Sequence, residues 1–153
     1  MMKIPLVILF IFVGGSSFAQ DLEKEKKLSA EYLAQVSKEP GAQVLEKGVV
    51  LRALYDSGSQ SHPDLSDTVN VTYHMVDREG KLIEESISAD EILKFPLKRL
   101  IKCWQIALPA MPIGSFYKIS CPSDTAYGDS GTSDGSIKGG AALTFRVTLF
   151  GVN

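Results

Sequence analysis

Hydrophobic and polar side chains alternate most regularly between residues 68 and 76. The apolar positions are Val69, Val71, Tyr73 and Met75. A period of two puts these side chains on one face of a β-strand and leaves the polar residues between them on the other face. A turn-forming sequence at 77–80 follows, and residues 81–84 then return along the first strand. The pattern predicts a strand with one buried and one solvated face.

The same alternation predicts four more strands, at residues 49–55, 93–97, 117–121 and 143–149. Residues 56–67 and 128–140 are rich in Ser, Gly and Asp, and they indicate surface loops. Strands that keep one face wet are typical of antiparallel sheets. The apolar face of such a sheet must pack against another element of the chain.

A short apolar stretch at residues 100–108, which ends before Pro109, predicts the single internal helix. It contains Trp104, the only tryptophan of the chain. This helix is the element that can cover the dry face of the sheet. We therefore predict an α+β fold in which a curled antiparallel sheet of about five strands wraps around one short helix.

A second helix is expected on the N-terminal side of the sheet, at residues 21–38. Leu28, Tyr32 and Val36 lie one turn apart and form a single apolar seam, and Pro40 helps to stop the helix. A seam this narrow could pack on its own domain or on a second copy of the chain. We expect a monomer or a weak dimer.

Residues 1–19 have the features of a secretory signal peptide. Lys3 supplies the positive end, residues 6–13 are apolar, and Ser17 and Ala19 are the small residues that precede cleavage. We expect cleavage near Ala19 and export to the periplasm or the medium. The alternative is a retained N-terminal anchor helix, although the apolar run is too short to span a bilayer. No later run predicts a stable membrane span.

Charge and cysteine content narrow the function classes. The formal net charge is −2, and it becomes −3 without residues 1–19 because Lys3 is their only charged residue. A mildly acidic chain lacks the basic face that nucleic acids require. Cys103 and Cys121 would lie in an oxidising compartment if the chain is exported, so one disulfide could form. A pair of free buried thiols is the alternative.

The loop sequence G-D-S-G at 128–131 resembles the nucleophile motif of chymotrypsin-like proteases. That chemistry needs a histidine base beside the serine. Neither histidine fits, because His62 precedes a proline in a polar loop and His74 is expected on the solvated face of a strand. No pair of Cys, His or carboxylate residues has metal-ligand spacing. We therefore expect no protease, no metal and no cofactor.

The remaining candidate site is aromatic and consists of Tyr73, Trp104, Tyr127 and Phe145. Each of these residues alone is more often part of a core. Tyr127 lies in a Gly/Ser loop, where a large side chain needs a surface to pack on, and Tyr and Trp carry polar tips that require a partner when buried. Together they predict a concave apolar site with a few polar groups, which is the usual character of a ligand site.

From about Val44 to Leu149 the chain resembles the FKBP-type peptidyl-prolyl cis-trans isomerases. The segments that carry the resemblance are V-N-V-T-Y at 69–73, F-P-L-K-R-L-I-K-C-W at 95–104, A-L-P-A-M-P-I-G at 107–114, A-Y-G at 126–128 and L-T-F-R-V-T-L at 143–149. They stand in the family's order and at nearly its spacing. The resemblance implies a half-barrel sheet around a helix, with a helical segment and linker at 20–43 and the isomerase domain at 44–153.

The resemblance also implies a function and a set of site residues. Substrates would be unfolded or partly folded polypeptides that contain proline, and macrolides would be a further ligand class. Trp104 would be the floor under the proline ring, the Ile101 N–H would donate to the substrate, and the Tyr127 hydroxyl would meet a substrate carbonyl. The residues expected to take part in catalysis are Tyr127, Trp104 and Glu84. The residues expected to bind substrate are Tyr73, Ile83, Leu93, Leu100, Ile101, Ile137 and Phe145.

Several positions depart from the family pattern. Ile83-Glu84 replaces a usual Phe-Asp, Leu93 replaces a pocket phenylalanine, Cys103 replaces a glycine, and residues 137–140 replace Ile-Pro-Pro. Loss of two aromatic side chains would open the pocket walls. Two hypotheses follow: an isomerase that assists the folding of exported proteins, or a catalytically weak or inactive chaperone or partner-binding module with the same fold.

Overall fold

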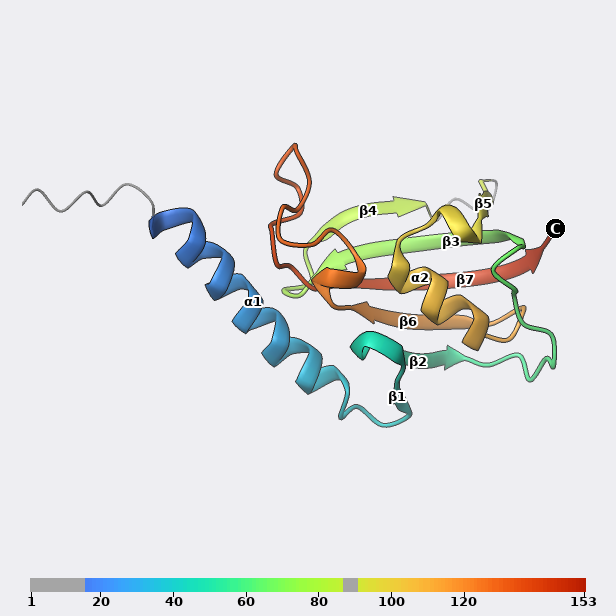
Figure 1. Cartoon of the computed structure of the whole chain (residues 1–153). Coiled ribbons are helices and arrows are strands. Elements are labelled where there is room, and N and C mark those ends of the chain that lie inside the picture. The colour runs from blue at the N-terminus through green and yellow to red at the C-terminus, as the bar shows by residue number, and fades with distance from the viewer. Residues whose placement is uncertain (1–15, 87–90) are drawn as a thin grey trace, which may run out of the picture.

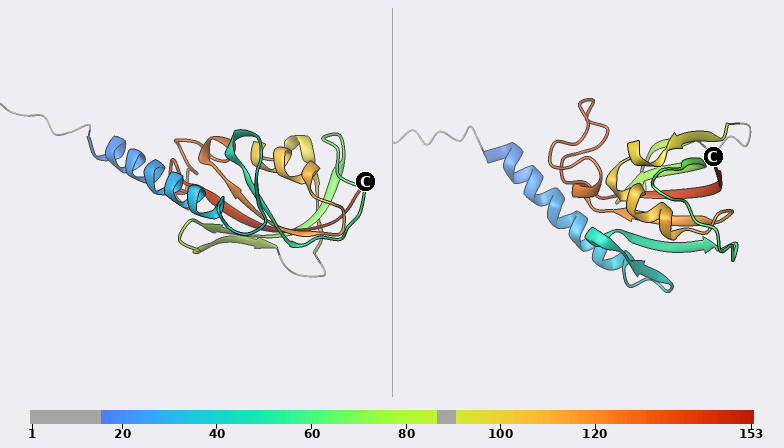
Figure 2. Two further views of the ribbon diagram at one scale, coloured as in Figure 1. Left: turned by 90° about the horizontal axis from the view of Figure 1, so that it is seen from below. Right: turned by 45° about the vertical axis from the view of Figure 1, so that its right-hand side comes forward.

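The fold, taken from a computed structural model that describes residues 16–86 and 91–153, is a seven-stranded antiparallel sheet with one helix on its concave face and one helix across its end (Figures 1 and 2). The strands are β1 (Ala42–Val44), β2 (Val50–Tyr55), β3 (Thr68–Asp77), β4 (Leu82–Ser86), β5 (Leu93–Pro96), β6 (Phe116–Cys121) and β7 (Leu143–Val152). The helices are α1 (Ser16–Val36) and α2 (Lys102–Ala107). The predicted α+β fold is confirmed.

The sheet is built around the two ten-residue strands β3 and β7, which pair along almost their whole length. The strand order is β1-β2-β6-β7-β3-β4, and β5 pairs with the first half of β3 while β4 pairs with its second half. The expected number of about five strands was too low. β1 was missed because three residues with exposed or half-buried side chains carry no alternation that could predict a strand.

The core lies between the concave face of the sheet and α2. Alternate residues of the long strands supply it, and Val69, Val71, Val147 and Leu149 are fully buried. The helix is shorter than residues 100–108: it covers Lys102–Ala107, and Pro109 lies in a tight 3-10 turn that follows it. Because Pro109 has no N–H to donate, it cannot extend the α-helical ladder.

A disulfide joins α2 to the sheet. Cys103 of α2 and Cys121 at the end of β6 are bonded, both side chains are fully buried, and their Cα atoms are 5.7 Å apart. The sequence allowed either a disulfide or two free thiols, and the structure contains the disulfide. The bond joins Cys103, the residue next to Trp104, to the end of β6.

Helix α1 starts earlier than the predicted range and packs along the end of the sheet where β3 stops and β7 begins (Figure 1). Its seam rests on its own domain: Val36 is buried, and the Tyr32 hydroxyl is hydrogen-bonded to the hydroxyl of Thr144 in β7. The apolar run at residues 6–13, on which the signal-peptide prediction rests, lies outside the described residues. Among the residues described, no helix is long and apolar enough to cross a membrane.

Candidate functional site

A small apolar pocket of about 110 Å³ opens between α2, the inner face of β3 and the loop that follows β6. Nine residues line it: Tyr73, Met75, Glu84, Phe95, Leu100, Ile101, Trp104, Tyr127 and Phe145. Seven of these nine were predicted from the sequence. The pocket is large enough for one five-membered ring and is open to the surface, as expected for a site that holds part of a longer chain.

Three aromatic rings form the floor and two walls. The ring of Trp104 meets the rings of Tyr73 and Phe145 edge-on, at centroid distances of 5.5 Å and 5.4 Å and interplanar angles of 88° and 86°. Tyr73 and Phe145 are themselves 6.3 Å apart. Edge-to-face contacts of this kind hold aromatic rings in fixed orientations. The walls therefore keep the indole of Trp104 in place under the pocket.

The pocket also contains polar donors that have no partner among the described residues. The indole N–H of Trp104 is buried and makes no hydrogen bond with any described residue. Within the same part of the chain, nothing accepts a hydrogen bond from the Ile101 N–H or from the Tyr127 hydroxyl. Unpaired donors around an apolar floor are suited to a ligand that carries carbonyl groups, because a peptide supplies the missing acceptors.

The sequence positions these groups by different means. Trp104 comes from the only full turn of α2, which begins directly after the extended residue Ile101. Since the first N–H groups of a helix have no intrahelical acceptor, the chain just before Trp104 presents a free donor at the pocket. Tyr127 comes from a loop, and it is followed by Gly128, whose φ of +64° is in the left-handed region that favours glycine.

Burial and a nearby carboxylate keep both pocket tyrosines protonated. Loss of solvent, followed by the effect of the Glu84 carboxylate, raises the pKa of Tyr73 well above its ordinary value. For Tyr73 the carboxylate acts first as a hydrogen-bond acceptor and then as a nearby negative charge. Loss of solvent, followed by repulsion from the same carboxylate, also raises the pKa of Tyr127. All of these effects disfavour the phenolate. The Tyr127 hydroxyl is therefore a hydrogen-bond donor over the whole neutral range.

We expect ligand binding and any catalysis in this pocket to be insensitive to phenol ionisation between about pH 6 and pH 9, because free tyrosine titrates near pH 10 and both shifts are upward. The measurement is kcat/KM for a proline-containing peptide as a function of pH, with the fluorescence of Trp104 as a control for folding. A decline in kcat/KM around pH 8 that is absent in Tyr127→Phe would contradict this assignment.

Three residues predicted for the site lie elsewhere. Ile83 is the extra residue of a bulge, because Glu84 pairs with Met75 and Leu82 pairs with Val76. The bulge directs Glu84 to the pocket, while Ile83 lines a separate hollow that also contains Ile137. Ile137 is buried in the core, and Leu93 packs against Val71 in the β3–β5 pair without reaching the pocket.

Two pocket residues were missed. Phe95 stands two residues after Leu93 on the same face of β5 and supplies an aromatic wall where leucine was expected to weaken it. Met75 follows Tyr73 on the same face of β3, so the alternation of that strand already contained the signal for it. The pocket is thus more aromatic than the sequence comparison at Ile83 and Leu93 suggested.

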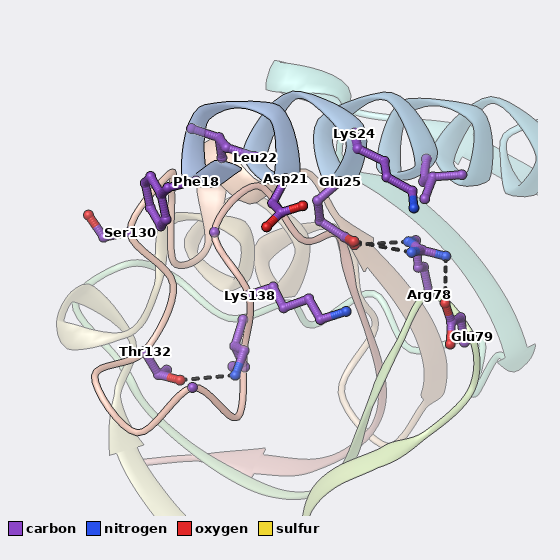
Figure 3. Close-up of a pocket in the computed structure, with 14 residues that line it drawn as sticks. Phe18, Asp21, Leu22, Lys24, Glu25, Arg78, Glu79, Ser130, Thr132 and Lys138 are labelled. Carbon is purple, nitrogen blue, oxygen red and sulfur yellow. Dashed lines mark hydrogen bonds and ion pairs between the residues drawn. The ribbon is translucent and has the colours of Figure 1, made fainter. Parts of the chain in front are cut away.

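A larger cavity, of about 810 Å³, lies between α1, the β3–β4 turn and the loop at residues 128–140 (Figure 3). Arg78 bonds Glu25 at 2.9 Å and Glu79 at 3.0 Å, whereas Asp21, Lys24 and Lys138 also line the cavity and form no ion pair among the described residues. This cavity is lined by charges of both signs and has no cluster of aromatic side chains that could form a binding floor. The small aromatic pocket is the better candidate for the functional site.

Comparison with known proteins agrees with this geometry. Residues 59–150 match the sequence profile of the family described as FKBP-type peptidyl-prolyl cis-trans isomerase. The chain is 32% identical over 133 residues to FKBP-type peptidyl-prolyl cis-trans isomerase FkpA of Aeromonas hydrophila, which covers 87% of this chain and 48% of that protein. It is 35% identical over 124 residues to peptidyl-prolyl cis-trans isomerase Mip of Coxiella burnetii, with 81% and 53% covered. The chain therefore spans about half the length of these curated relatives.

The fold has close counterparts among solved structures. The crystal structure of a peptidyl-prolyl cis-trans isomerase from Pseudomonas syringae superposes with a TM-score of 0.79 at 29% identity. The match covers 86% of this chain and 95% of that one. The overall fold is thus shared with a protein named as a peptidyl-prolyl cis-trans isomerase.

Proposed function

Because the chain belongs to the FKBP-type peptidyl-prolyl cis-trans isomerase family, we propose that it catalyses cis-trans isomerisation of the bond that precedes proline in polypeptides. The observation that carries the proposal is the Trp104 floor enclosed by Tyr73, Phe95 and Phe145. A flat indole with aromatic walls is complementary to the apolar ring of proline. Unfolded or partly folded chains are the proposed substrates, because only they present such a ring to an exposed pocket.

The chemistry needs no nucleophile and no acid–base pair. The barrier to rotation about the peptide bond is about 18–20 kcal/mol because amide resonance must be broken, whereas cis and trans forms before proline differ by only about 0.5–1 kcal/mol. Twisting the bond localises the lone pair on the proline nitrogen and reduces the polarity of the amide. An apolar pocket therefore favours the twisted state over the planar state, and each 1.4 kcal/mol or so of this preference gives about tenfold in rate.

The unpaired donors would orient a peptide bound in the pocket. The Ile101 N–H and the Tyr127 hydroxyl lie on different elements that border the same floor, and this supports the proposal that they bind carbonyls on either side of the prolyl bond. Glu84 lies at the rim with its side chain exposed, and we assign it an accessory role through its effect on the two tyrosines. A macrolide of the class that FKBP proteins bind would occupy the same floor and compete with peptide.

The test is the rate of cis-to-trans conversion in a proline-containing peptide. The wild-type protein is expected to accelerate the reaction, and Tyr127→Phe to lower kcat/KM by about tenfold, which corresponds to one hydrogen bond made in the transition state. Tyr55→Phe is the matched control, because Tyr55 is an exposed tyrosine at the end of β2. If the wild-type protein gave no acceleration above the uncatalysed rate, the proposed isomerase would be excluded.

We also propose that the protein is exported after cleavage near Ala19. The charge, apolar run and small residues of positions 1–19 support this proposal. The disulfide between Cys103 and Cys121 supports it independently, because disulfides persist in oxidising compartments such as the periplasm. N-terminal sequencing of the protein recovered from the cell envelope would identify the cleavage site.

The alternative function is a chaperone or partner-binding module with little catalysis. It rests on the substitutions at Ile83, Glu84 and Leu93. Of these only Glu84 lines the pocket, and Phe95 supplies an aromatic wall. These contacts favour the isomerase. A chaperone would suppress aggregation of an unfolded protein equally well with and without the indole of Trp104, whereas holding through the prolyl site would be lost together with catalysis.

A further inference from the structure

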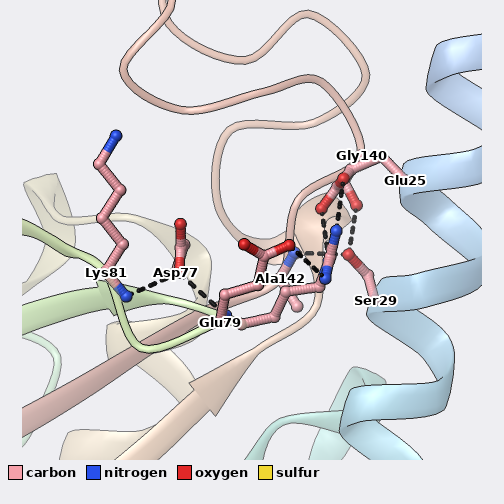
Figure 4. A network of polar contacts seen from close by, with 8 residues as sticks. Glu25, Ser29, Asp77, Glu79, Lys81, Gly140 and Ala142 are labelled. Atoms are coloured by element: carbon pink, nitrogen blue, oxygen red, sulfur yellow. Dashed lines mark hydrogen bonds and ion pairs between the residues drawn. The ribbon is translucent and has the colours of Figure 1, made fainter.

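Helix α1 contacts the part of the domain that carries Tyr127. The Lys26 ammonium bonds the Asp129 carboxylate at 3.0 Å, and Asp129 is two residues after Tyr127. Ser29, which is 5% exposed, donates its hydroxyl to the Gly140 carbonyl and accepts from the Ala142 N–H, both at 2.9 Å. Figure 4 shows Ser29 reaching from α1 to the backbone at this point. The helix therefore holds both ends of the loop at residues 128–140.

A path of hydrogen bonds connects Ser29 to the residue next to Tyr127. The Gly140 carbonyl accepts from Ser29, and the Gly140 N–H donates to the Gly128 carbonyl at 2.9 Å. The Gly131 N–H in turn donates to the Tyr127 carbonyl at 3.2 Å. The backbone next to Tyr127 is therefore hydrogen-bonded to Gly140, and Gly140 is hydrogen-bonded to the Ser29 side chain of α1.

The fit between α1 and the loop is close. Gly140 has a φ of +78°, and a Cβ placed on it would lie 2.9 Å from the Cγ atom of Lys26 and 3.1 Å from the Cδ1 atom of Leu22. A larger residue would push the helix away. The contact and the positive φ together give a physical reason for glycine at this position.

The other wall of the pocket is held by the same helix. Arg78, in the turn between β3 and β4, donates two hydrogen bonds to the Glu25 carboxylate, at 2.9 Å and 3.1 Å. Both side chains are largely buried, with 15% and 10% exposed. Paired charges of this kind are geometrically specific. The turn leads directly into β4, which carries Glu84.

No hydrogen bond among the described residues fixes the Tyr127 side chain, so its placement depends on packing and on the backbone that carries it. It is 38% exposed, and its hydroxyl has no hydrogen-bond partner among the residues that the structure describes. On one side its backbone is anchored by the Gly128 N–H, which donates to the Ser123 carbonyl at 2.7 Å, and on the other by the loop that α1 contacts. Misplacing a transition-state contact by about 1 Å can cost a hundredfold in rate.

We propose that α1 positions the Tyr127 loop over the pocket and that Ser29 is the principal positioning residue. This inference rests on the proposed isomerase function and adds a structural control of that site by a helix outside the pocket. Ser29 is not among the residues that line the pocket, and its two hydrogen bonds lead to the Tyr127 loop through Gly140 and to β7 through Ala142. In this proposal the first route carries its effect on activity.

The test compares Ser29→Ala with Ser37→Ala, each made in the wild-type and in the Tyr127→Phe background. Ser37 is the matched control because its hydroxyl bonds only the nearby Ala34 carbonyl. We expect Ser29→Ala to lower kcat about tenfold with little change in KM, and to have less than about a twofold effect when the Tyr127 hydroxyl is already absent. An equal loss in both backgrounds would show a merely structural role and overturn the proposal.

Hydrogen exchange supplies a readout that does not depend on catalysis. In Ser29→Ala the Gly128, Gly131 and Gly140 amides are expected to exchange at least about tenfold faster, and Lys26→Met, which removes an exposed contact, should act in the same direction with the fold intact. Unchanged exchange in both variants would overturn the proposal. If the wild-type protein lacked isomerase activity, the proposed function would fail, and exchange would still decide whether α1 fixes the loop.

Discussion

Trp104→Leu is expected to lower kcat/KM for a proline-containing peptide by about a hundredfold, because a branched aliphatic side chain cannot replace the flat floor of the pocket. The indole makes two edge-to-face contacts, with Tyr73 and Phe145. Such contacts contribute about 0.5–1.5 kcal/mol each, and the indole also supplies the surface that meets the proline ring. A combined loss of about 2.7 kcal/mol corresponds to the expected hundredfold.

Leucine is chosen over alanine because truncating a buried aromatic residue to alanine costs about 3–5 kcal/mol of stability, which would confuse loss of activity with loss of fold. Phe150→Leu is the matched control, since Phe150 is an exposed aromatic residue near the end of β7. Both variants should show the same circular dichroism spectrum at the assay temperature. Activity of Trp104→Leu within about threefold of the wild type would contradict the assignment of Trp104 as the floor.

Reduction of the disulfide between Cys103 and Cys121 is expected to lower the free energy of unfolding by about 3 kcal/mol, because the bond closes a loop of this length in the unfolded chain. The sequence separation is 18 residues, and both sulfurs are fully buried. For a domain of this size such a loss lowers Tm by about 10 °C. Thermal unfolding with and without a reductant measures the difference.

A double variant, Cys103→Ala/Cys121→Ala, separates the bond from the reductant. It should melt close to the reduced wild-type protein, slightly lower because each substitution removes a buried atom from the core. It should not respond to the reductant at all. Titration of two free thiols in the denatured, unreduced protein would show that the bond had not formed, and the expected difference in Tm would then be absent.

The pocket shows how far residue patterns lead and where they stop. Trp104, Tyr73, Phe145 and Tyr127 could be predicted because each lies in a local pattern, a short apolar helix, an alternating strand or an A-Y-G loop, that fixes its place. Ile83 could not be assigned correctly, because the bulge opposite Met75 shifts the alternation of β4 by one residue. A one-residue insertion in an edge strand leaves no mark on the residue pattern itself.

Phe95 and Leu93 illustrate a different limit. Both belong to the same face of β5, so the alternation of that strand cannot say which of them reaches the pocket. The answer depends on how the sheet curls over α2 and on where β5 pairs along β3. Curl and pairing are properties of the whole sheet, and they arise from contacts between segments that are distant in the chain.

Local residue patterns predicted the strands of the sheet other than the three-residue β1, the short central helix and the aromatic floor of the pocket, because side-chain periodicity and helix-stopping prolines act over a few residues. Only the tertiary structure decided that Cys103 and Cys121 are joined, that α1 packs on its own domain, and that the buried Ser29 ties this helix to the loop of Tyr127. Each of these is a contact between residues far apart in the chain. Such contacts depend on the three-dimensional packing of all the elements, which no local pattern encodes.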